Sequence, residues 1–156
     1  LELYLSESAR CGYCVWMIDD IEIVALAPTA SAFIEFREKC GWGQISTDIA
    51  EASLASGLVQ LSAWQNGQLA GFVRVVGDGA LYFYIQDLIV RDDLRGRGIG
   101  GMLMERVMSE LKSIVPPGGA IGLMAASGKE AFYESFGFVS RPNNAFGSGM
   151  TFVASK

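Results

Sequence analysis

Three apolar stretches separated by turn residues lie in the middle of the chain. Residues 58–64 and 68–76 alternate between apolar and polar positions, and Asn66-Gly67 between them is typical of a hairpin turn. Residues 81–90 follow a similar turn, Asp78-Gly79, and are apolar on both faces, as in a central strand. The pattern therefore predicts a meander of three antiparallel strands.

Shorter elements are expected ahead of this meander. Alternating residues indicate strands, and apolar residues at helical spacing indicate two helices that Gly41 and Gly57 end. Thr47 or Asp48 is expected to cap the second helix. These expected elements are strands over 15–18 and 19–27 and helices over 28–40 and 47–55.

After the meander the apolar period changes from two to about four. Ile99, Leu103, Val107 and Leu111 recur on one face, which predicts an amphipathic helix of roughly four turns. A short apolar strand follows, so that strand, helix and strand form a crossover between parallel strands. The expected remaining elements are strands over 120–125 and 150–153 and a helix over 129–136.

Composition limits the chemistry available to the chain. Its 156 residues, 51% of them hydrophobic, suit one globular domain over 18–156, with residues 1–17 an uncertain lead segment. The sequence has no histidine, so histidine bases, Ser-His-Asp triads and histidine-ligated zinc are excluded. A net charge of −5 disfavours nucleic acid as a partner and is compatible with a cationic small substrate.

Cysteine and hydropathy patterns indicate a reduced, cytoplasmic protein. Three cysteines are too few for a disulfide framework, and Cys11 and Cys14 with Cys40 offer at most three sulfurs to a metal. A redox or metal function of the Cys11/Cys14 pair is kept as an alternative. No apolar run is long enough to span a bilayer, and no export signal is evident, so no membrane partner is expected.

The segment 91–101 carries the most specific chemistry in the sequence. A strand ends, a glycine-rich loop follows, and a long helix begins among the glycines. Loop amides and the helix N-terminus then provide free donors and positive potential, which suits a phosphate. Glycines let the backbone approach such a ligand, and Arg95 and Arg97 add charge-assisted contacts.

Two other phosphate-binding motifs fit this segment less well. A Walker loop needs Gly-Lys followed by Ser or Thr, which is absent. Residues 96–101 match a dinucleotide-binding GxGxxG only loosely, because the preceding strand closes an antiparallel meander rather than opening a parallel unit. Glycines that serve only as a turn and a helix cap remain the simplest alternative.

The order and spacing of three segments resemble the GNAT family of N-acetyltransferases over roughly 18–153. Residues 95–100, Arg-Gly-Arg-Gly-Ile-Gly, look like that family's Arg/Gln-x-x-Gly-x-Gly/Ala pyrophosphate loop. Residues 85–90 resemble its fourth strand, and residues 132–138 its late aromatic helix with Gly-Phe. The resemblance implies an α+β fold, an α/β/α sandwich. Its mixed, mostly antiparallel central sheet would splay between the fourth and fifth strands, 81–90 and 120–125.

The resemblance also implies a reaction and its residues. Acetyl-CoA would donate its acetyl group to a primary amine of a small molecule or peptide, with no metal. Tyr133 would be the general acid that protonates the departing thiolate. The residues implied to bind the cosubstrate are Leu88, Ile89, Val90, Arg95, Gly96, Arg97, Gly98, Ile99, Gly100 and Gly101.

The general base is less clear from the residues. Asp87 is the best-placed carboxylate, and strand alternation puts it among apolar side chains, so it should be hydrogen-bonded or lie in a cleft. A purely structural Asp87 is the alternative. Gln86, Glu134 and water are weaker candidates. The residues select no particular acceptor amine. A homodimer is a further expectation, and a non-catalytic acyl-CoA-binding sensor is the alternative function.

Overall fold

The computed structural model describes residues 15–18 and 20–153 of the chain, with the side chains of 15–18 left out. It divides into two compact units, Leu1–Gly122 and Leu123–Lys156, and each is described by itself. Most of the lead segment 1–17 and the Cys11/Cys14 pair lie outside the described residues. The expectation of one domain over 18–156 therefore stays a prediction.

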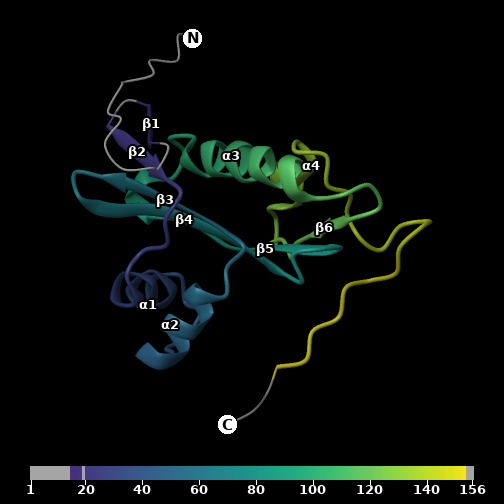
Figure 1. The fold of residues 1–156 in the computed structure, drawn as a ribbon, viewed down its shortest axis with the longest axis horizontal. Helices are drawn as coiled ribbons and strands as arrows, with labels where there is room; N and C mark the ends of the chain where they lie inside the picture. Colours follow the sequence, from purple (N-terminus) through teal and green to yellow (C-terminus); the bar gives the residue numbers. More distant parts are fainter. Residues whose placement is uncertain (1–14, 19, 154–156) are drawn as a thin grey trace. The chain divides into compact units, whose positions relative to one another are not determined.

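The first unit is built on one six-stranded sheet whose strands follow their order in the chain (Figure 1). Neighbouring strands are antiparallel except the last pair, which is parallel, so both the meander and the crossover are confirmed. The strands are β1 (Val15–Ile18), β2 (Ile21–Val24), β3 (Val59–Gln65), β4 (Gln68–Gly77), β5 (Tyr82–Val90) and β6 (Ala120–Gly122).

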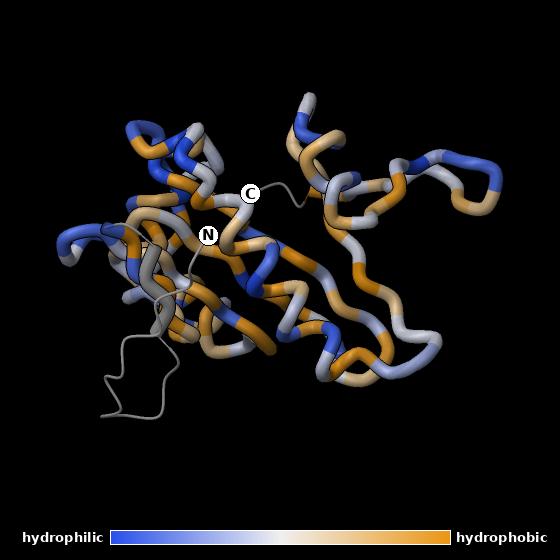
Figure 2. The backbone as a smooth tube through the Cα atoms, turned by 90° about the horizontal axis from the view of Figure 1, so that it is seen from above, coloured by the Kyte–Doolittle hydropathy of each residue, from blue (hydrophilic) through white to orange (hydrophobic). Residues whose placement is uncertain are grey.

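Helices cover both faces of this sheet, which confirms the expected α/β/α sandwich (Figure 1). Helices α1 (Ala30–Lys39) and α2 (Thr47–Ala55) cover one face, where Phe33 meets Phe72 of β4. Helix α3 (Ile99–Ile114) covers the other face and contacts β3, β4 and β5. Its predicted apolar stripe is buried. Figure 2 shows apolar and polar residues interspersed along the backbone.

The first two helices begin at hydroxyl caps. The Thr29 side chain accepts a hydrogen bond from the amide of Ala32, and the Ser46 side chain accepts one from the amide of Ile49. The prediction that Thr47 or Asp48 caps α2 was wrong, because the cap lies one position before Thr47. Ser46 has the extended backbone of a cap residue, whereas Thr47 already belongs to the helix.

The second unit contains less regular structure than its sequence predicted. Helix α4 (Glu130–Glu134) is shorter than expected, and Gly137 follows it with a φ of +89°. The predicted strand over 150–153 was wrong, because these residues form no strand in the structure. Apolar residues alone do not make a strand without a partner ladder, and Met150 and Phe152 are 91% and 93% exposed.

Close packing between β4 and α3 depends on Gly71. A Cβ added there would lie 2.9 Å from Leu103 Cδ1 and 3.2 Å from the carbonyl oxygen of Ile89. The backbone oxygen cannot move aside as a flexible side chain could. The small residue therefore sets how closely α3 approaches the sheet beside β5.

We expect Gly71→Ala to destabilise the protein by about 1–3 kcal/mol through overpacking. Chemical denaturation with an unchanged m-value would measure this loss. Gly149→Ala is the matched control, because a Cβ there meets nothing within 4 Å. Equal midpoints for the two variants would contradict the packing role of Gly71.

Candidate active site

The glycine-rich segment lies between β5 and α3 as predicted. A short 3-10 helix, η1 (Asp92–Leu94), follows β5, and its buried Leu94 attaches this segment to the core. Gly96 and Gly98 then take φ values of +80° and +83°, where L side chains are strained. A Cβ at either position would meet nothing within 4 Å, so the backbone is open to a ligand.

Helix α3 begins without a side-chain cap. Its N-cap residue is Gly98, whereas Thr29 and Ser46 cap α1 and α2. The first helical hydrogen bond to Gly98 comes from the amide of Met102. The amides of residues 99–101 therefore precede the helical ladder, and they concentrate the positive end of the helix dipole.

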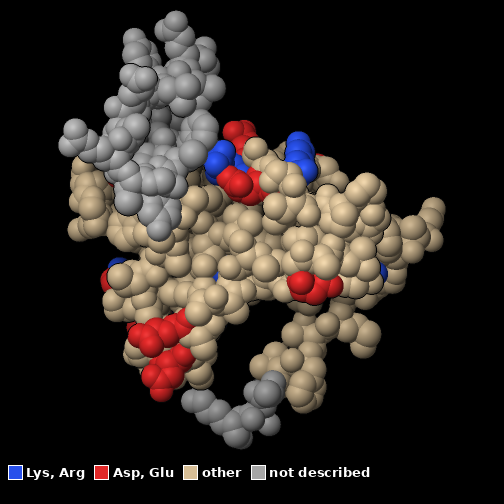
Figure 3. All heavy atoms as spheres, viewed as in Figure 1, with Lys and Arg blue, Asp and Glu red and all other residues tan. Residues whose placement is uncertain are grey.

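Both arginines of the segment pair with carboxylates at the surface. Arg95 Nη2 lies 2.6 Å from Asp92 Oδ1, and Arg97 Nη2 lies 2.7 Å from Asp20 Oδ1. Exposed pairs of this kind contribute at most about 1 kcal/mol each. An anionic ligand can therefore compete for these guanidinium groups. Charges of both signs lie together over α3 in Figure 3, rather than in a basic patch.

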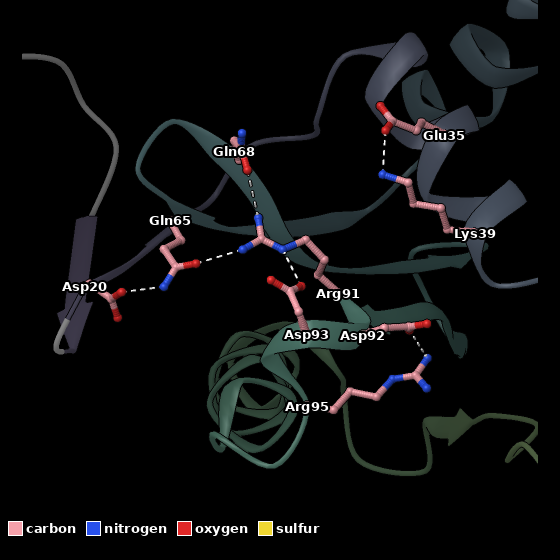
Figure 4. Close-up of polar contacts among 9 residues, drawn as sticks. All are labelled: Asp20, Glu35, Lys39, Gln65, Gln68, Arg91, Asp92, Asp93 and Arg95. Carbon is pink, nitrogen blue, oxygen red and sulfur yellow. Dashed lines mark hydrogen bonds and ion pairs between the residues drawn. The ribbon is translucent and has the colours of Figure 1, made fainter.

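Arg91, at the start of the glycine-rich segment, forms hydrogen bonds with the β3–β4 hairpin (Figure 4). Its guanidinium donates to Asp93 Oδ1 at 2.7 Å, to Gln65 Oε1 at 2.8 Å and to Gln68 Oε1 at 3.3 Å. Gln65 in turn donates to Asp20, the partner of Arg97. The hydrogen bond from Gln65 lowers the pKa of Asp20 most, and the hydrogen bond from Arg97 lowers it further. The network connects the hairpin to the start of α3.

A β-bulge interrupts β5 just before the glycine-rich segment. Phe72 pairs with Ile89 and Arg74 with Gln86, so two β5 residues, Asp87 and Leu88, lie opposite the single residue between them on β4. Asp87 takes a φ of +55°. A left-handed conformation costs a non-glycine residue about 1–2 kcal/mol, so other contacts must hold it.

Two arginines provide those contacts to Asp87. Arg74 Nε donates to Oδ2 at 2.5 Å, and Arg37 Nη1 donates to Oδ1 at 3.2 Å. The Asp87 side chain is 0% exposed. The expectation that this carboxylate is hydrogen-bonded is confirmed. Sequence reasoning missed both arginines, although a charged Arg74 inside the buried run of β4 was a signal for a buried partner.

The edge of β5 that faces away from β4 is paired over only part of its length. Strand β6 pairs only with Tyr82–Tyr84, where Tyr84 lies opposite Gly122. No strand pairs with this edge over residues 85–90 in the described part of the chain. Strand β6 ends at Gly122, so the strand expected over 120–125 is three residues shorter than predicted. Leu88, Ile89 and Val90 therefore lie beyond the paired part of this edge, and the splay expected between the two strands stays a prediction.

Tyr133 belongs to α4 in the second unit. It is half-buried, and its ring packs edge to face with Phe132 at 5.1 Å and with Phe138 at 6.3 Å between centroids. Burial raises the pKa of the Tyr133 phenol above its ordinary value of 10.0. The hydroxyl is therefore protonated at neutral pH and able to donate a proton.

Comparison with known proteins supports the same family. A family model described as an acetyltransferase (GNAT) domain matches residues 31–155. An uncharacterised N-acetyltransferase of Pyropia yezoensis is 24% identical over 114 residues, 70% of this chain and 64% of that protein. Serotonin N-acetyltransferase 2, chloroplastic, of Oryza sativa is 30% identical over 90 residues, 58% of this chain and 43% of that protein.

Solved structures share the fold at low identity. A Staphylococcus aureus protein described as a probable acetyltransferase has a TM-score of 0.79 and 24% identity, covering 86% of this chain and 99% of that one. A GNAT family acetyltransferase from Brucella melitensis, in complex with acetyl-CoA, has a TM-score of 0.57 and 19% identity, covering 77% and 83%.

The fold, the glycine-rich segment and the matched family model define the class. The chain belongs to the GNAT family of acetyltransferases. It spans between 42% and 64% of the length of the curated relatives it matches. Across the described residues no helix is long and apolar enough to cross a membrane, and no group of three or more acidic or cysteine side chains could hold a metal ion.

Because folding raises the pKa of Tyr133, its phenol makes stability depend on pH at the alkaline end. The contribution is fully present below pH 10, and it is lost as pH rises through the folded pKa, because the unfolded chain ionises first. Relative to Tyr133→Phe, we expect the wild type to lose melting temperature above pH 10. Melting curves from pH 8 to 11 measure this, with Tyr82→Phe as the exposed control. Parallel curves for wild type and Tyr133→Phe would refute it.

Proposed function

We propose that this chain is an acetyl-CoA-dependent N-acetyltransferase acting on a primary amine of a small molecule or peptide. The observation that carries the proposal is the uncapped start of α3, which follows two left-handed glycines with open space beside them. The four residues 95–98 between η1 and α3 thus offer amides and guanidinium groups to a pyrophosphate. A turn or a helix cap alone would not need both arginines.

The open edge of β5 supports the next part of the proposal. Residues 85–90 have main-chain groups on that edge that no described strand uses. Amide and carbonyl groups of Leu88, Ile89 and Val90 would pair with the pantetheine arm and orient the thioester carbonyl. An amide directed at that carbonyl oxygen stabilises the negative charge that develops when the amine attacks.

Tyr133 is proposed as the general acid. The attacking amine displaces the CoA thiolate, which takes a proton from the Tyr133 hydroxyl as the carbon–sulfur bond breaks. The raised pKa of the phenol supports this role, because it keeps the proton in place at neutral pH.

The attacking amine must lose a proton before or during attack. The group that accepts this proton is the next part of the proposal. Asp87 was predicted for this role, with a structural carboxylate as the alternative. Its side chain is 0% exposed, and each oxygen accepts from an arginine, so it offers no accessible lone pair to an amine. These contacts favour the structural alternative. We propose that water accepts the proton of the amine, or that the amine binds in its deprotonated form.

The acceptor we propose is a cationic amine. Acidic side chains gather over α1 and α2 in Figure 3, which suits a cationic amine. A cytoplasmic location and a homodimer stay predictions, and the Oryza sativa relative is named chloroplastic.

An amine panel with thiol-release detection tests the proposed function directly. Purified chain, acetyl-CoA and arylalkylamines (serotonin among them), polyamines, amino acids and peptide N-termini should give amine-dependent thiol release with at least one class. Tight acetyl-CoA binding without release for any amine would favour the acyl-CoA-binding sensor instead.

Gly98→Asp should weaken acetyl-CoA binding by about tenfold or more relative to Gly98→Asn. Both variants add a similar side chain at a left-handed position that Asn and Asp tolerate, but only Asp places a negative charge beside the helix N-terminus. Titration calorimetry measures both dissociation constants. Equal dissociation constants for the two variants would show that this segment does not bind the pyrophosphate.

Tyr133→Phe should lower kcat by roughly 100-fold, the lower end for loss of a general acid, with acetyl-CoA affinity nearly unchanged. The change removes one hydroxyl and keeps the ring that packs on Phe132 and Phe138. Steady-state kinetics beside calorimetry separate rate from binding, with Tyr82→Phe as the control. An equal loss of rate and affinity would point to a binding or packing role.

A further inference from the structure

Asp87 is the meeting point of three elements that are distant in sequence. It belongs to β5, while Arg74 comes from β4 and Arg37 from α1. Two guanidinium groups lie against one fully buried carboxylate, so the cluster carries a net positive charge. One arginine would already neutralise the charge of Asp87. The second arginine therefore indicates a role other than charge neutralisation.

Both arginines are also held at their far side. Arg74 Nη1 donates to the carbonyl oxygen of Ser53 in α2 at 2.7 Å, and Arg37 Nη2 donates to that of Trp42 after α1 at 3.4 Å. The Phe33 ring lies 5.7 Å from each guanidinium carbon, between ring centroid and Cζ. Each guanidinium group therefore has a partner besides Asp87, and a shifted Asp87 would lengthen its bonds to both arginines.

The position of Asp87 in turn determines the course of β5. Its left-handed backbone forms the bulge opposite β4, and the residues that follow, 88–90, form the open edge of the sheet. The side-chain contacts of Asp87 with Arg37 and Arg74 hold it in this left-handed conformation. Without them, the extra residue of the bulge could move along the strand and turn the amides of 88–90 to other directions.

We propose that Arg37 and Arg74 are positioning residues that act through Asp87 to hold the main chain of residues 88–90 in the orientation that acetyl transfer needs. This inference rests on the proposed function. Neither arginine would touch the thioester or the amine. Through Ser53 and Trp42, the same contacts connect both helices on this face of the sheet to the reacting edge of β5.

The test compares Asp87→Asn, Arg37→Gln and Arg37→Lys with the control Glu35→Gln. The control breaks the exposed Glu35–Lys39 ion pair of the same helix and leaves Asp87 untouched. For each folded variant, kcat and KM for acetyl-CoA are measured from pH 6 to 9 with the best amine of the panel. Hydrogen–deuterium exchange of residues 85–90 and a melting curve accompany the kinetics.

We expect Asp87→Asn and Arg37→Gln to lower kcat by roughly 10- to 100-fold at every pH, as for a small misplacement of reacting groups. KM for acetyl-CoA should rise by a smaller factor than kcat falls, because the glycine-rich segment still binds the pyrophosphate when residues 88–90 pair less well with the pantetheine arm. Exchange at residues 85–90 should speed up. Arg37→Lys should recover part of the rate by restoring a cation, and the control should match wild type.

Different results would overturn the proposal. A kcat loss confined to low pH would make Asp87 the base. A lower melting temperature with unchanged kcat and exchange would leave the three residues a structural role only. If wild type transfers acetyl to no amine, the proposed function fails, and exchange alone then decides whether Asp87 and the arginines hold residues 85–90. If Asp87→Asn does not fold, Arg37→Gln carries the test, because Arg37 is partly exposed.

Discussion

Unequal pairing along the two edges of β5 is the constraint on which this structure depends. Strand β4 accompanies β5 from Phe83 to Val90, whereas β6 accompanies it only from Tyr82 to Tyr84. A strand in the middle of a sheet normally has both edges filled, since unpaired main-chain groups are costly when buried. Among the residues that the structure describes, nothing pairs with one edge of β5 beside the segment that leads into α3. The open edge and the helix N-terminus thus come from one uninterrupted stretch, 85–101.

Much of this arrangement could be predicted because local sequence encodes it. The turn at Asn66-Gly67, the four-residue period from Ile99 and the glycines before it each need only neighbouring residues to be interpreted. The cap of α2 was misplaced by one position, because Ser46, Thr47 and Asp48 are all good cap residues. The strand over 150–153 was wrong because a strand exists only with a partner, which local sequence does not supply.

The contacts of Asp87 show what sequence could not provide. Alternation correctly placed it among buried residues and required a hydrogen-bond partner. Its partners, Arg37 and Arg74, are 50 and 13 residues away, so only the sheet and the α1 packing bring them together. The same applies to Asp20, which reaches Arg97 across 77 residues. A net charge of −5 says nothing about such local pairs, in which each arginine meets a specific carboxylate.

The missing cap of α3 links the ligand to folding. A helix capped by its own side chain is equally stable whether or not anything binds, but α3 has no such group at Gly98. An anion held by its first amides would act as the cap, so part of the binding energy becomes folding energy of the longest helix. By mass action, a ligand at 100 times its Kd adds about 2.7 kcal/mol to the folded state. The concentration of such an anion would then also change the free energy of unfolding of the chain.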